Sequence, residues 1–566
     1  MYPSPPQTPN SQSRTTHVRG RVVLAIFAVL LAVVVGRFVQ LQIVQHAYWL
    51  GRAQASQERI IQLPPQRGSI LDRNGVALAI DVKAMAIAVD GINLTNESAA
   101  VTILVEELAL PRSDVQEKVS RDSYFTWINR RVDFDTAQRI RERANAADVY
   151  GLVFIDTWKR WYPQGRLASN LIGFVGTDGA GLEGLEMAYD EQLQGTAQVI
   201  RVLEGADGRT YNIEVVEQGQ RGKDLTLSIE MGLQFICEEE IRTGVNQFRA
   251  LGGMIVLLDP HTGDVLAMAQ DKGYDLNAFW DSTPEQRRNL AVTHLFEPGS
   301  IFKVFTGLAA LENGVVSPAD TFNGNDGIDV FGHVMHNADN ESYGMVTFAE
   351  IIEHSINTGM IRVAQGLTED QLHDLLAGFG FGTTTKVGLP GEERGILRPV
   401  ADWSGLALAA HSIGQSVAVT GIQLARAVAV IASDGILRTP RIIVPAMDDV
   451  APPDGVRVCS RDSANTMLAL MRAVVESGTG TLAAIDGFAV AGKTGTAQKA
   501  VAGQGYVVGK YTSLFAGILD ANSPDYVMVV VLDEVQSGSP SGGYTAGQIF
   551  RRAATRLIAH ERLAPS

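Results

Sequence analysis

A continuous apolar run close to the N-terminus restricts what this chain can fold into. Residues 22–36 contain no polar or charged side chain, and the apolar character continues past Arg37 to Val44. At 1.5 Å per residue, a helix over 22–44 spans about 34 Å, enough to cross a bilayer if Arg21 and Arg37 extend toward the head groups. The sequence therefore predicts a transmembrane anchor over residues 22–44.

The residues before this run indicate its orientation. Residues 1–21 contain no acidic residue but carry Arg14, Arg19 and Arg21. Positive flanks stay on the cytoplasmic side, so we expect a cytoplasmic tail over 1–21, a single pass through the cytoplasmic (inner) membrane and an extracytoplasmic remainder. A cleaved signal peptide is the alternative, but no small-x-small triplet closes the apolar run.

Composition narrows the classes of function. The 566 residues allow two to four domains, and the formal charge of −15 with no basic face argues against nucleic acid as a partner. Cys237 and Cys459 show no metal-ligand spacing, which argues against structural zinc. Whether these two cysteines form a disulfide stays open.

Residues 45–222 form a region without a nucleophile–base pair or a metal cluster. We expect it to be an α+β pedestal domain that spaces or docks the rest of the chain. Its predicted elements are a helix leaving the membrane over 44–66, two short strands around an Asp/Asn-Gly turn over 67–79, helices over 98–108 and 135–146, and a strand over 151–156.

Residues 223–566 have a different pattern, in which helices are enclosed by strands from both ends of the region. Such an order favours one antiparallel sheet with helices on its faces, an α+β fold. The predicted strands are 224–230, 253–259, 264–269, 488–493, 511–519 and 526–534, and the predicted helices are 231–248, one after Ser300, 418–434 and 463–477.

A hydroxyl and an amine stand three residues apart in Ser300-Ile-Phe-Lys303. Pro298 and Gly299 break the chain just before, and an apolar stripe at helical spacing follows. Ser300 is therefore expected in the first helical turn, with Lys303 one turn further and able to take the serine proton if its pKa is depressed. Alone, Ser-x-x-Lys is also an ordinary way to begin a surface helix.

Two later segments supply further groups of the same kind. Ser355 and Asn357 place a hydroxyl and an amide two residues apart, although such a pair alone is a common helix start. An apolar strand ends at Lys493-Thr494-Gly495-Thr496, where Lys493 could hold a carboxylate, Thr494 could donate to it and Gly495 could permit close backbone approach.

The segment 487–494 also matches the pattern Gly-x4-Gly-Lys-Thr of a phosphate-binding loop. Three features of the segment argue against this interpretation. The four intervening residues are apolar and strand-like, and residues 494–497 are a poor helix start. The segment also lies outside the cell in the topology above.

Ser-x-x-Lys, Ser-x-Asn and Lys-Thr-Gly in this order are the motif set of penicillin-binding proteins and serine β-lactamases. The resemblance extends from the membrane span to the C-terminus and is strongest to class B penicillin-binding proteins, with the division-specific (FtsI-type) and sporulation-specific members as the nearest types. Residues 416–420 and 546–548 depart from the family pattern. The stretches that carry the resemblance outside the three motifs are Arg67–Gly75, Tyr162-Pro163, Gly184–Glu186, Thr262-Gly263, Glu297–Gly299, Val334–Asn337 and Ile413–Gln415.

The resemblance implies a serine D,D-transpeptidase of peptidoglycan with no metal or organic cofactor. Ser300 would attack the bond between the two terminal D-alanines, and Lys303, kept neutral by the nearby cation of Lys493, would take its proton. Ser355 would relay the proton to the leaving amine, and Asn357 would hold the substrate amide and Lys303. Backbone N–H groups of Ser300 and Thr496 would form the oxyanion site, while Lys493, Thr494 and Thr496 grip the carboxylate. His333 and His336 are interpreted as loop residues.

The same resemblance implies the partners and the place of action. The partners would be stem peptides and lipid-linked glycan, β-lactams as covalent inhibitors, a polytopic SEDS-type (shape, elongation, division and sporulation) glycan polymerase and other division proteins. The division septum is the expected site. Alternatives are an elongation- or sporulation-specific transpeptidase, a D,D-carboxypeptidase, a secreted β-lactamase, or a non-enzymatic penicillin sensor or inactive scaffold.

Overall fold

The computed structural model describes residues 12–49, 58–120, 125–204, 210–444, 455–501 and 505–565. The chain divides into two compact units. Unit 1 comprises Met1–Pro64, Met85–Ile155 and Ala197–Gln220, and unit 2 comprises Pro65–Ala84, Asp156–Thr196 and Arg221–Ser566.

The predicted anchor is helical. Helix α1 covers Gln12–Val39 and continues into a π-helical turn, η1, over Gln40–Val44. The segment Val18–Val44 has a mean hydropathy of 2.9, and none of its most apolar window is buried in the protein. One helix among the described residues is therefore long and apolar enough to cross a membrane, which fits a single-pass anchor.

Unit 1 contains a three-stranded antiparallel sheet of β1 (Glu58–Leu63), β6 (Gln198–Glu204) and β7 (Thr210–Glu217), in the order β1-β6-β7. The helix predicted over 44–66 is wrong in its last part, because β1 is a strand whose Glu58 pairs with Leu203 and whose Leu63 pairs with Gln198. Residues 50–57 of that prediction lie outside the described residues. The partner strand is far along the chain, so local periodicity could not reveal the pairing.

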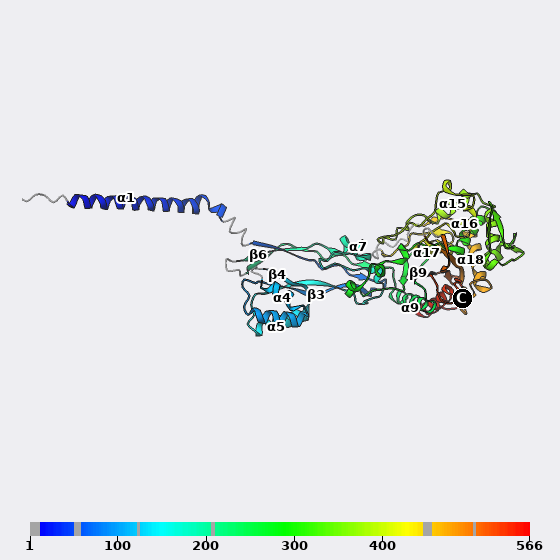
Figure 1. Cartoon of the computed structure of the whole chain (residues 1–566), viewed down its shortest axis with the longest axis horizontal. Helices are drawn as coiled ribbons and strands as arrows, with labels where there is room; N and C mark the ends of the chain where they lie inside the picture. The colour runs from blue at the N-terminus through cyan, green and yellow to red at the C-terminus, as the bar shows by residue number, and fades with distance from the viewer. Residues whose placement is uncertain are drawn as a thin grey trace, which may run out of the picture. The chain divides into compact units, whose positions relative to one another are not determined.

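The rest of unit 1 packs three helices against strands (Figure 1). The helices predicted over 98–108 and 135–146 are confirmed as α3 (Glu97–Leu108) and α5 (Phe134–Ala146), and α4 (Arg112–Val119) lies between them in sequence. The strands are β3 (Ala77–Val89), whose residues from Met85 on belong to unit 1, β4 (Thr126–Asp133) and β5 (Leu152–Trp161), whose residues up to Ile155 belong to unit 1. Ile87, Leu104 and Ile140 lie in the core between helices and strands.

Unit 2 begins with the predicted hairpin, now β2 (Ile70–Leu71) and β3, joined at a turn in which Asp72 Oδ1 accepts from Asn74 N and Val76 N. Strand β8 (Leu225–Thr226) pairs in parallel with β2. The strand predicted over 224–230 is therefore much shorter than expected. Glu230 instead caps the following helix, α9 (Met231–Phe248), by accepting from Gly232 N and Leu233 N.

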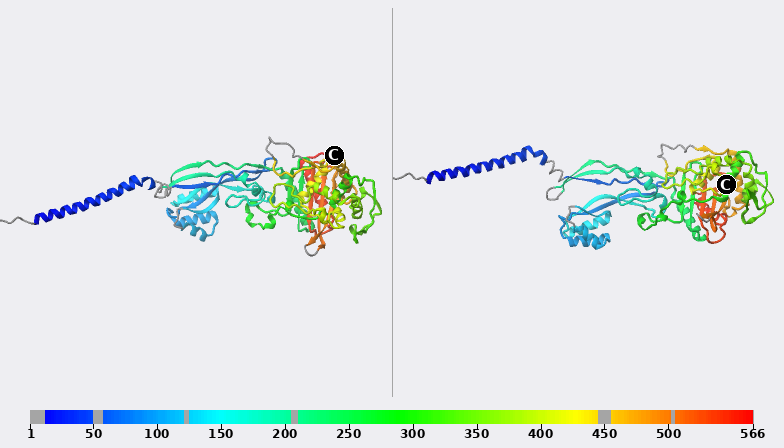
Figure 2. Two further views of the ribbon diagram at one scale, coloured as in Figure 1. Left: turned by 90° about the horizontal axis from the view of Figure 1, so that it is seen from above. Right: turned by 45° about the horizontal axis from the view of Figure 1, so that its top comes forward.

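The centre of unit 2 is a five-stranded antiparallel sheet in the order β10-β9-β19-β18-β17. Strand β17 is at one edge, and its far half pairs only with the start of β18, so that this hairpin (orange in Figure 2) extends beyond β19. The strands are β9 (Gly252–Leu258), β10 (Val265–Gln270), β17 (Ala491–Val501), β18 (Gly505–Leu519) and β19 (Tyr526–Asp533).

Both faces of this sheet are buried, because successive side chains of a strand point to opposite faces. Val256 and Val529 belong to one apolar cluster, and their neighbours Leu257 and Val530 belong to another. On the second face lie α9 and α19 (Ala546–Glu561), and on the first lies α17 (Gly421–Ala432). The predicted antiparallel sheet with helices on its faces is confirmed.

The first face also carries α12 (Phe302–Glu312), which is buried apart from its last residues. Around it pack α13 (Phe348–Glu353), α14 (Asn357–Ala364), α15 (Glu369–Gly378), α16 (Ala407–Ser412) and α18 (Arg461–Glu476). The remaining short elements are α6 (Ser169–Ile172), α7 (Gly184–Ala188), α8 (Asp190–Gln194), η2 (Leu276–Asp281), α10 (Pro284–Arg287), α11 (Leu290–Thr293), η3 (Gly299–Ile301), β11 (Thr321–Asn323), β12 (Ile328–Val330), β13 (His333–Met335), η4 (Ala338–Asn340), β14 (Met345–Thr347), η5 (Val400–Asp402), β15 (Ile436–Leu437), β16 (Val456–Arg457) and η6 (Thr481–Ala483).

Candidate active site

Ser300 lies in η3, the 3-10 turn that leads directly into α12. Gly299 before it has a φ of +53°, a left-handed conformation that glycine adopts at little cost. Lys303 follows one turn later, and its Nζ lies 3.1 Å from Ser300 Oγ. The hydroxyl and the amine are thus within hydrogen-bonding distance.

Lys303 is completely buried, with 0 % of its surface exposed. Burial is the largest cause that lowers its pKa well below the ordinary value of a lysine, and the charge of Lys493 lowers the pKa further. The sequence by itself indicates only Lys493 as a cause of the lowered pKa. Because removing an ammonium from water costs more free energy than removing a neutral amine, the buried helix face itself favours the neutral base.

Ser355 lies in the connection between α13 and α14, with a φ of +61°. A capping box of Thr347 and Glu350 begins α13 and fixes where this connection falls. Ser355 Oγ lies 3.2 Å from Lys303 Nζ and 2.8 Å from Lys493 Nζ, and the backbone carbonyl of Ser355 also accepts a hydrogen bond from Lys303. One hydroxyl therefore bridges two amines.

Asn357 is the first residue of α14, two residues beyond Ser355. Its Nδ2 donates to the carbonyl oxygen of His336 at 2.8 Å, and among the described residues it makes no hydrogen bond to Lys303. The contact of Asn357 with Lys303 stays a prediction, because in this structure the amide is turned toward His336. The hydrogen bond to the carbonyl of His336 fixes the orientation of the Asn357 amide. The sequence could not reveal it, because the segments of His336 and Asn357 meet only in the folded chain.

The side chain of Asn337 supports the same loop. It is 5 % exposed, accepts from Thr358 N at 2.9 Å and donates to the carbonyls of Gly324 and Glu341. Sequence reasoning did not assign it a role, although it lies in the Val334–Asn337 stretch. His336 pairs through Nδ1 with Asp326 at 2.8 Å.

Lys493, Thr494, Gly495 and Thr496 are consecutive residues of the edge strand β17. Lys493 is fully buried, and burial lowers its pKa to about 7. Thr494 Oγ1 lies 2.8 Å from Thr479 Oγ1, and Thr496 Oγ1 accepts from Gly542 N at 3.1 Å. The strand continues to Val501 with no helix after Thr494, so the phosphate-loop pattern at 487–494 does not form such a loop.

Close backbone contacts hold the serine turn against β17. A Cβ atom at Gly495 would lie 2.9 Å from the carbonyl oxygen of Pro298, and one at Gly414 would lie 2.1 Å from the carbonyl oxygen of Gly299. Gly299 N also donates to the carbonyl of Gly414 at 3.2 Å. A side chain at Gly414 or at Gly495 would therefore displace the turn that carries Ser300.

A buried ion-pair network explains several other motif residues of unit 2. Glu186 is completely buried and accepts from Arg67 Nε and Arg160 Nε, both at 2.7 Å, while Tyr162 OH lies 3.3 Å from the same carboxylate. Arg67 also reaches Asp190 at 2.6 Å. Each buried arginine therefore has a carboxylate partner. The network joins Arg67, at the beginning of unit 2, to Arg160 and Glu186 later in the chain.

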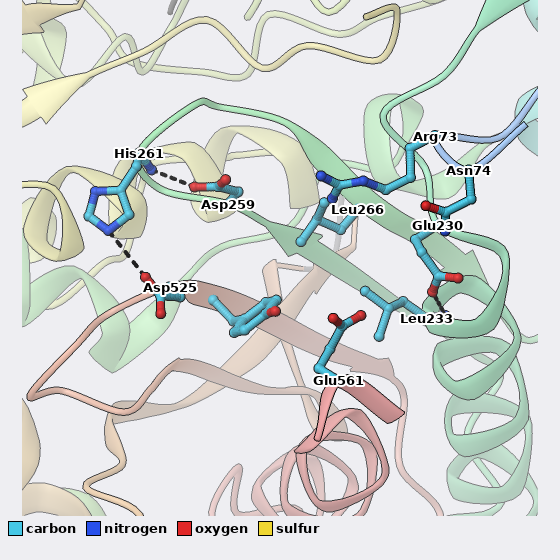
Figure 3. A pocket seen from close by; sticks show the side chains of 10 residues that line it. Arg73, Asn74, Glu230, Leu233, Asp259, His261, Leu266, Asp525 and Glu561 are labelled. Atoms are coloured by element: carbon cyan, nitrogen blue, oxygen red, sulfur yellow. Dashed lines mark hydrogen bonds and ion pairs between the residues drawn. The ribbon is translucent and has the colours of Figure 1, made fainter. Parts of the chain in front are cut away.

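A polar cavity of unit 2, of about 400 Å³, is lined by residues outside the Ser-x-x-Lys, Ser-x-Asn and Lys-Thr-Gly motifs, among them Arg73 and Asn74 of the Arg67–Gly75 stretch (Figure 3). Among the described residues, Glu230, His560 and Glu561 place their ligand atoms within 4.8 Å of one another there. The carboxylate of Glu230 is already used, because it accepts from Gly232 N and Leu233 N and lies 3.2 Å from His560 Nε2. The Glu230 carboxylate thus serves as the N-terminal cap of α9.

Comparison with known proteins identifies two domains. Residues 253–555 match the penicillin-binding protein transpeptidase domain, and residues 62–227 match the penicillin-binding protein dimerisation domain. Together with the buried serine–lysine site on a helix beside a sheet edge, these matches define the class: the chain belongs to the class B penicillin-binding proteins, and it carries a serine transpeptidase domain.

Individual relatives cover almost the whole chain. The chain is 30 % identical over 545 residues to the probable peptidoglycan D,D-transpeptidase PenA of Neisseria gonorrhoeae, covering 95 % of this chain and 92 % of that protein. It is 31 % identical over 531 residues to the peptidoglycan D,D-transpeptidase FtsI of Escherichia coli K12, covering 92 % and 88 %. Penicillin-binding protein 3 of Mycobacterium tuberculosis, solved with aztreonam, superposes with a TM-score of 0.70 at 29 % identity, covering 89 % of this chain and 98 % of that one.

Proposed function

We propose that this protein is a membrane-anchored peptidoglycan D,D-transpeptidase that uses Ser300 as its nucleophile. The observation that carries the proposal is the meeting of three distant segments at one hydroxyl. Ser355 Oγ lies 3.2 Å from Lys303 Nζ and 2.8 Å from Lys493 Nζ. Lys303 Nζ in turn lies 3.1 Å from Ser300 Oγ. A nucleophile, a desolvated base and a proton carrier are thereby connected.

Acylation begins with Ser300 Oγ attacking the carbonyl carbon between the two terminal D-alanines. Neutral Lys303 takes the hydroxyl proton, and backbone N–H groups of Ser300 and Thr496 stabilise the oxyanion. The proton passes through Ser355 to the leaving nitrogen as the C–N bond breaks, which releases D-alanine. Lys493, Thr494 and Thr496 hold the terminal carboxylate of the donor.

The second half-reaction reverses the proton path. The amine of a neighbouring stem peptide attacks the serine ester, its proton returns through the same groups to Ser300 Oγ, and a new peptide bond forms the cross-link. A D,D-carboxypeptidase would admit water at this step instead. Asn357, whose amide donates to the carbonyl of His336, positions the substrate amide in this proposal.

The membrane topology and partners follow from the same proposal. The tail over 1–21 lies in the cytoplasm, the anchor covers 22–44, a pedestal covers 45–222 and the transpeptidase domain covers 223–566 outside the cytoplasm. Arg14, Arg19 and Arg21 support this orientation. The similarity to FtsI supports a role at the division septum beside a SEDS-type glycan polymerase and other division proteins.

The test is covalent labelling of membranes that contain the full chain with a fluorescent penicillin, followed by a denaturing gel. We expect a labelled band for the wild type and for Ser317→Ala, an exposed serine outside the site. Ser300→Ala should abolish the band. Labelling that survives Ser300→Ala would place the nucleophile elsewhere. Incubation with a stem peptide and an acceptor amine then separates cross-linking from hydrolysis.

A further inference from the structure

Helix α14, which begins at Asn357 just after Ser355, has no capping side chain of its own. The residue at its N-cap position is Ile356, whose side chain cannot accept a hydrogen bond. The first backbone N–H groups of a helix have no partner within the helix, so a buried helix start needs an acceptor from elsewhere. The start of α14 therefore depends on another part of the chain.

Asn337 supplies this acceptor from 21 residues earlier in the sequence. Its Oδ1 accepts from Thr358 N at 2.9 Å. Its Nδ2 donates to the carbonyl oxygens of Gly324 and Glu341, at 2.9 and 2.8 Å. Both donor hydrogens and the acceptor oxygen of the amide are thus used, and only one orientation of the amide satisfies all three partners. The side chain is buried, so these bonds are made inside the protein.

The residue before Asn337 acts on the same helix start. The carbonyl oxygen of His336 accepts from Asn357 Nδ2 at 2.8 Å. Asp326 holds both loop residues, because its Oδ1 accepts from Asn337 N at 2.7 Å and its Oδ2 lies 2.8 Å from His336 Nδ1. Two consecutive residues of the loop therefore contact two consecutive residues of α14, Asn357 and Thr358.

Ser355 depends on this support because its backbone is strained. Its φ of +61° is a left-handed conformation that residues other than glycine keep only where the surroundings impose it. On one side, Ile356 N donates to the carbonyl of Ile351 in α13 at 3.0 Å. On the other side, Asn337 holds the chain at Thr358 N. Without this second support Ser355 relaxes toward a more common conformation, and its hydroxyl moves away from the two lysine amines.

We propose that Asn337 is a positioning residue of the transpeptidase reaction, which holds Ser355 in place by capping α14 from a distant loop. Asn337 touches no reacting atom in this scheme. Its effect passes through the backbone of Thr358 to the hydroxyl that carries the proton to the leaving nitrogen. This role rests on the proposed function, because it takes Ser355 as that proton carrier.

Two donor peptides that differ only in their leaving group test this role. One ends in D-alanyl-D-alanine, whose leaving nitrogen needs a proton. The other has a thioester in place of the last peptide bond, and its sulfur leaves as a thiolate without one. Second-order acylation rate constants are measured on the detergent-solubilised full chain by competition with a fluorescent penicillin. The ratio of the two rate constants reports on the proton path and is independent of the folded fraction.

Three substitutions of Asn337 should change this ratio to different extents. Asn337→Ala should slow the amide donor about 100-fold and the thioester donor less than about tenfold, because the loss falls on protonation of the leaving group. Asn337→Ser is milder, should shift the ratio in the same direction and serves where the alanine variant does not fold. Asn337→Asp retains an oxygen that accepts from Thr358 N, so its ratio should stay within about threefold of the wild type.

Thr368→Ala is the matched control for the loss of a helix cap. Thr368 and Gln371 form the capping box of α15, a helix of the same unit that carries no residue of the proposed site. The substitution removes a cap and lowers the melting temperature, but should leave both rate constants within about twofold of the wild type. Thermal unfolding of each variant measures the loss of stability separately from the loss of rate.

The outcomes separate this role from the proposed function. If penicillin fails to label the wild type at Ser300, the transpeptidase proposal itself fails. If penicillin labels the wild type but Asn337→Ala and Asn337→Ser slow both donors equally, or slow neither, only the positioning role is overturned. A ratio in Asn337→Asp as low as in Asn337→Ala would overturn the capping of Thr358 N as its cause.

Discussion

Lys493 Nζ donates a hydrogen bond to Ser355 Oγ at 2.8 Å across 138 residues of sequence. The same hydroxyl lies 3.2 Å from Lys303 Nζ, so two buried amines meet at one oxygen. Because two neighbouring cations in a desolvated site repel each other, a protonated Lys493 favours a neutral Lys303. Ser355 therefore connects Lys493, the proposed carboxylate-binding residue, to Lys303, the proposed base.

The rate of acylation should depend on pH in a bell shape. Lys303 must be neutral, and because its pKa is lowered, the base is present above that lowered pKa and is lost as the pH falls through it. Lys493 must be cationic to bind a carboxylate, and its pKa of about 7 means that this charge is lost as the pH rises through that value. Rate constants for penicillin acylation from pH 5 to 9 measure both limbs.

The alkaline limb has its own test. Lys493→Arg keeps a positive charge at every accessible pH, so acylation at high pH should no longer decline, even if the absolute rate is lower. An unchanged alkaline limb in this variant would assign the decline to another group.

Lys303→Arg should reduce acylation by about 1,000-fold while the protein stays folded. Arginine keeps the charge but does not deprotonate, so no base remains beside Ser300. The measurement is stopped-flow or gel-based acylation with penicillin, with thermal unfolding as the check on folding. Acylation at the wild-type rate would exclude Lys303 as the base.

Gly414→Ala should slow acylation at least tenfold and lower the free energy of unfolding by more than about 2 kcal/mol. The added Cβ would lie 2.1 Å from the carbonyl oxygen of Gly299, the residue before Ser300. Gly314→Ala is the matched control, because Gly314 also has a positive φ, +65° against +79°, but a Cβ there meets no atom within 4 Å. The control carries only the backbone cost of about 1 kcal/mol. Equal effects in both variants would contradict the steric explanation.

Glu186→Gln should destabilise unit 2 by about 3 kcal/mol, because it leaves Arg67 and Arg160 buried with less compensating charge. Chemical denaturation that follows the fluorescence of the full chain measures the effect. Glu191→Gln, an exposed position on α8, should change stability by less than about 0.5 kcal/mol. A Glu186→Gln variant as stable as the wild type would show that the network contributes no net stability.

Local sequence patterns predicted many elements of the fold. The helix over 231–248 appears with those bounds as α9, and the hairpin around Thr262-Gly263 appears as β9 and β10. Each of these elements has a periodicity or a turn signal within its own residues. The prediction was wrong where a distant partner decides the structure, as in β1, which pairs with β6, and in β8, which is short because Glu230 caps α9.

The motifs fix which residues carry hydroxyls, amines and amides, and their order identifies the family. The order of the motifs does not determine the contacts between segments, and these were decided by the fold. Burial outweighs Lys493 in lowering the pKa of Lys303, and the carbonyl of His336 holds Asn357. The physical reason is that spacing within a segment sets helix and strand faces, whereas desolvation and hydrogen bonds between segments exist only once the chain has packed.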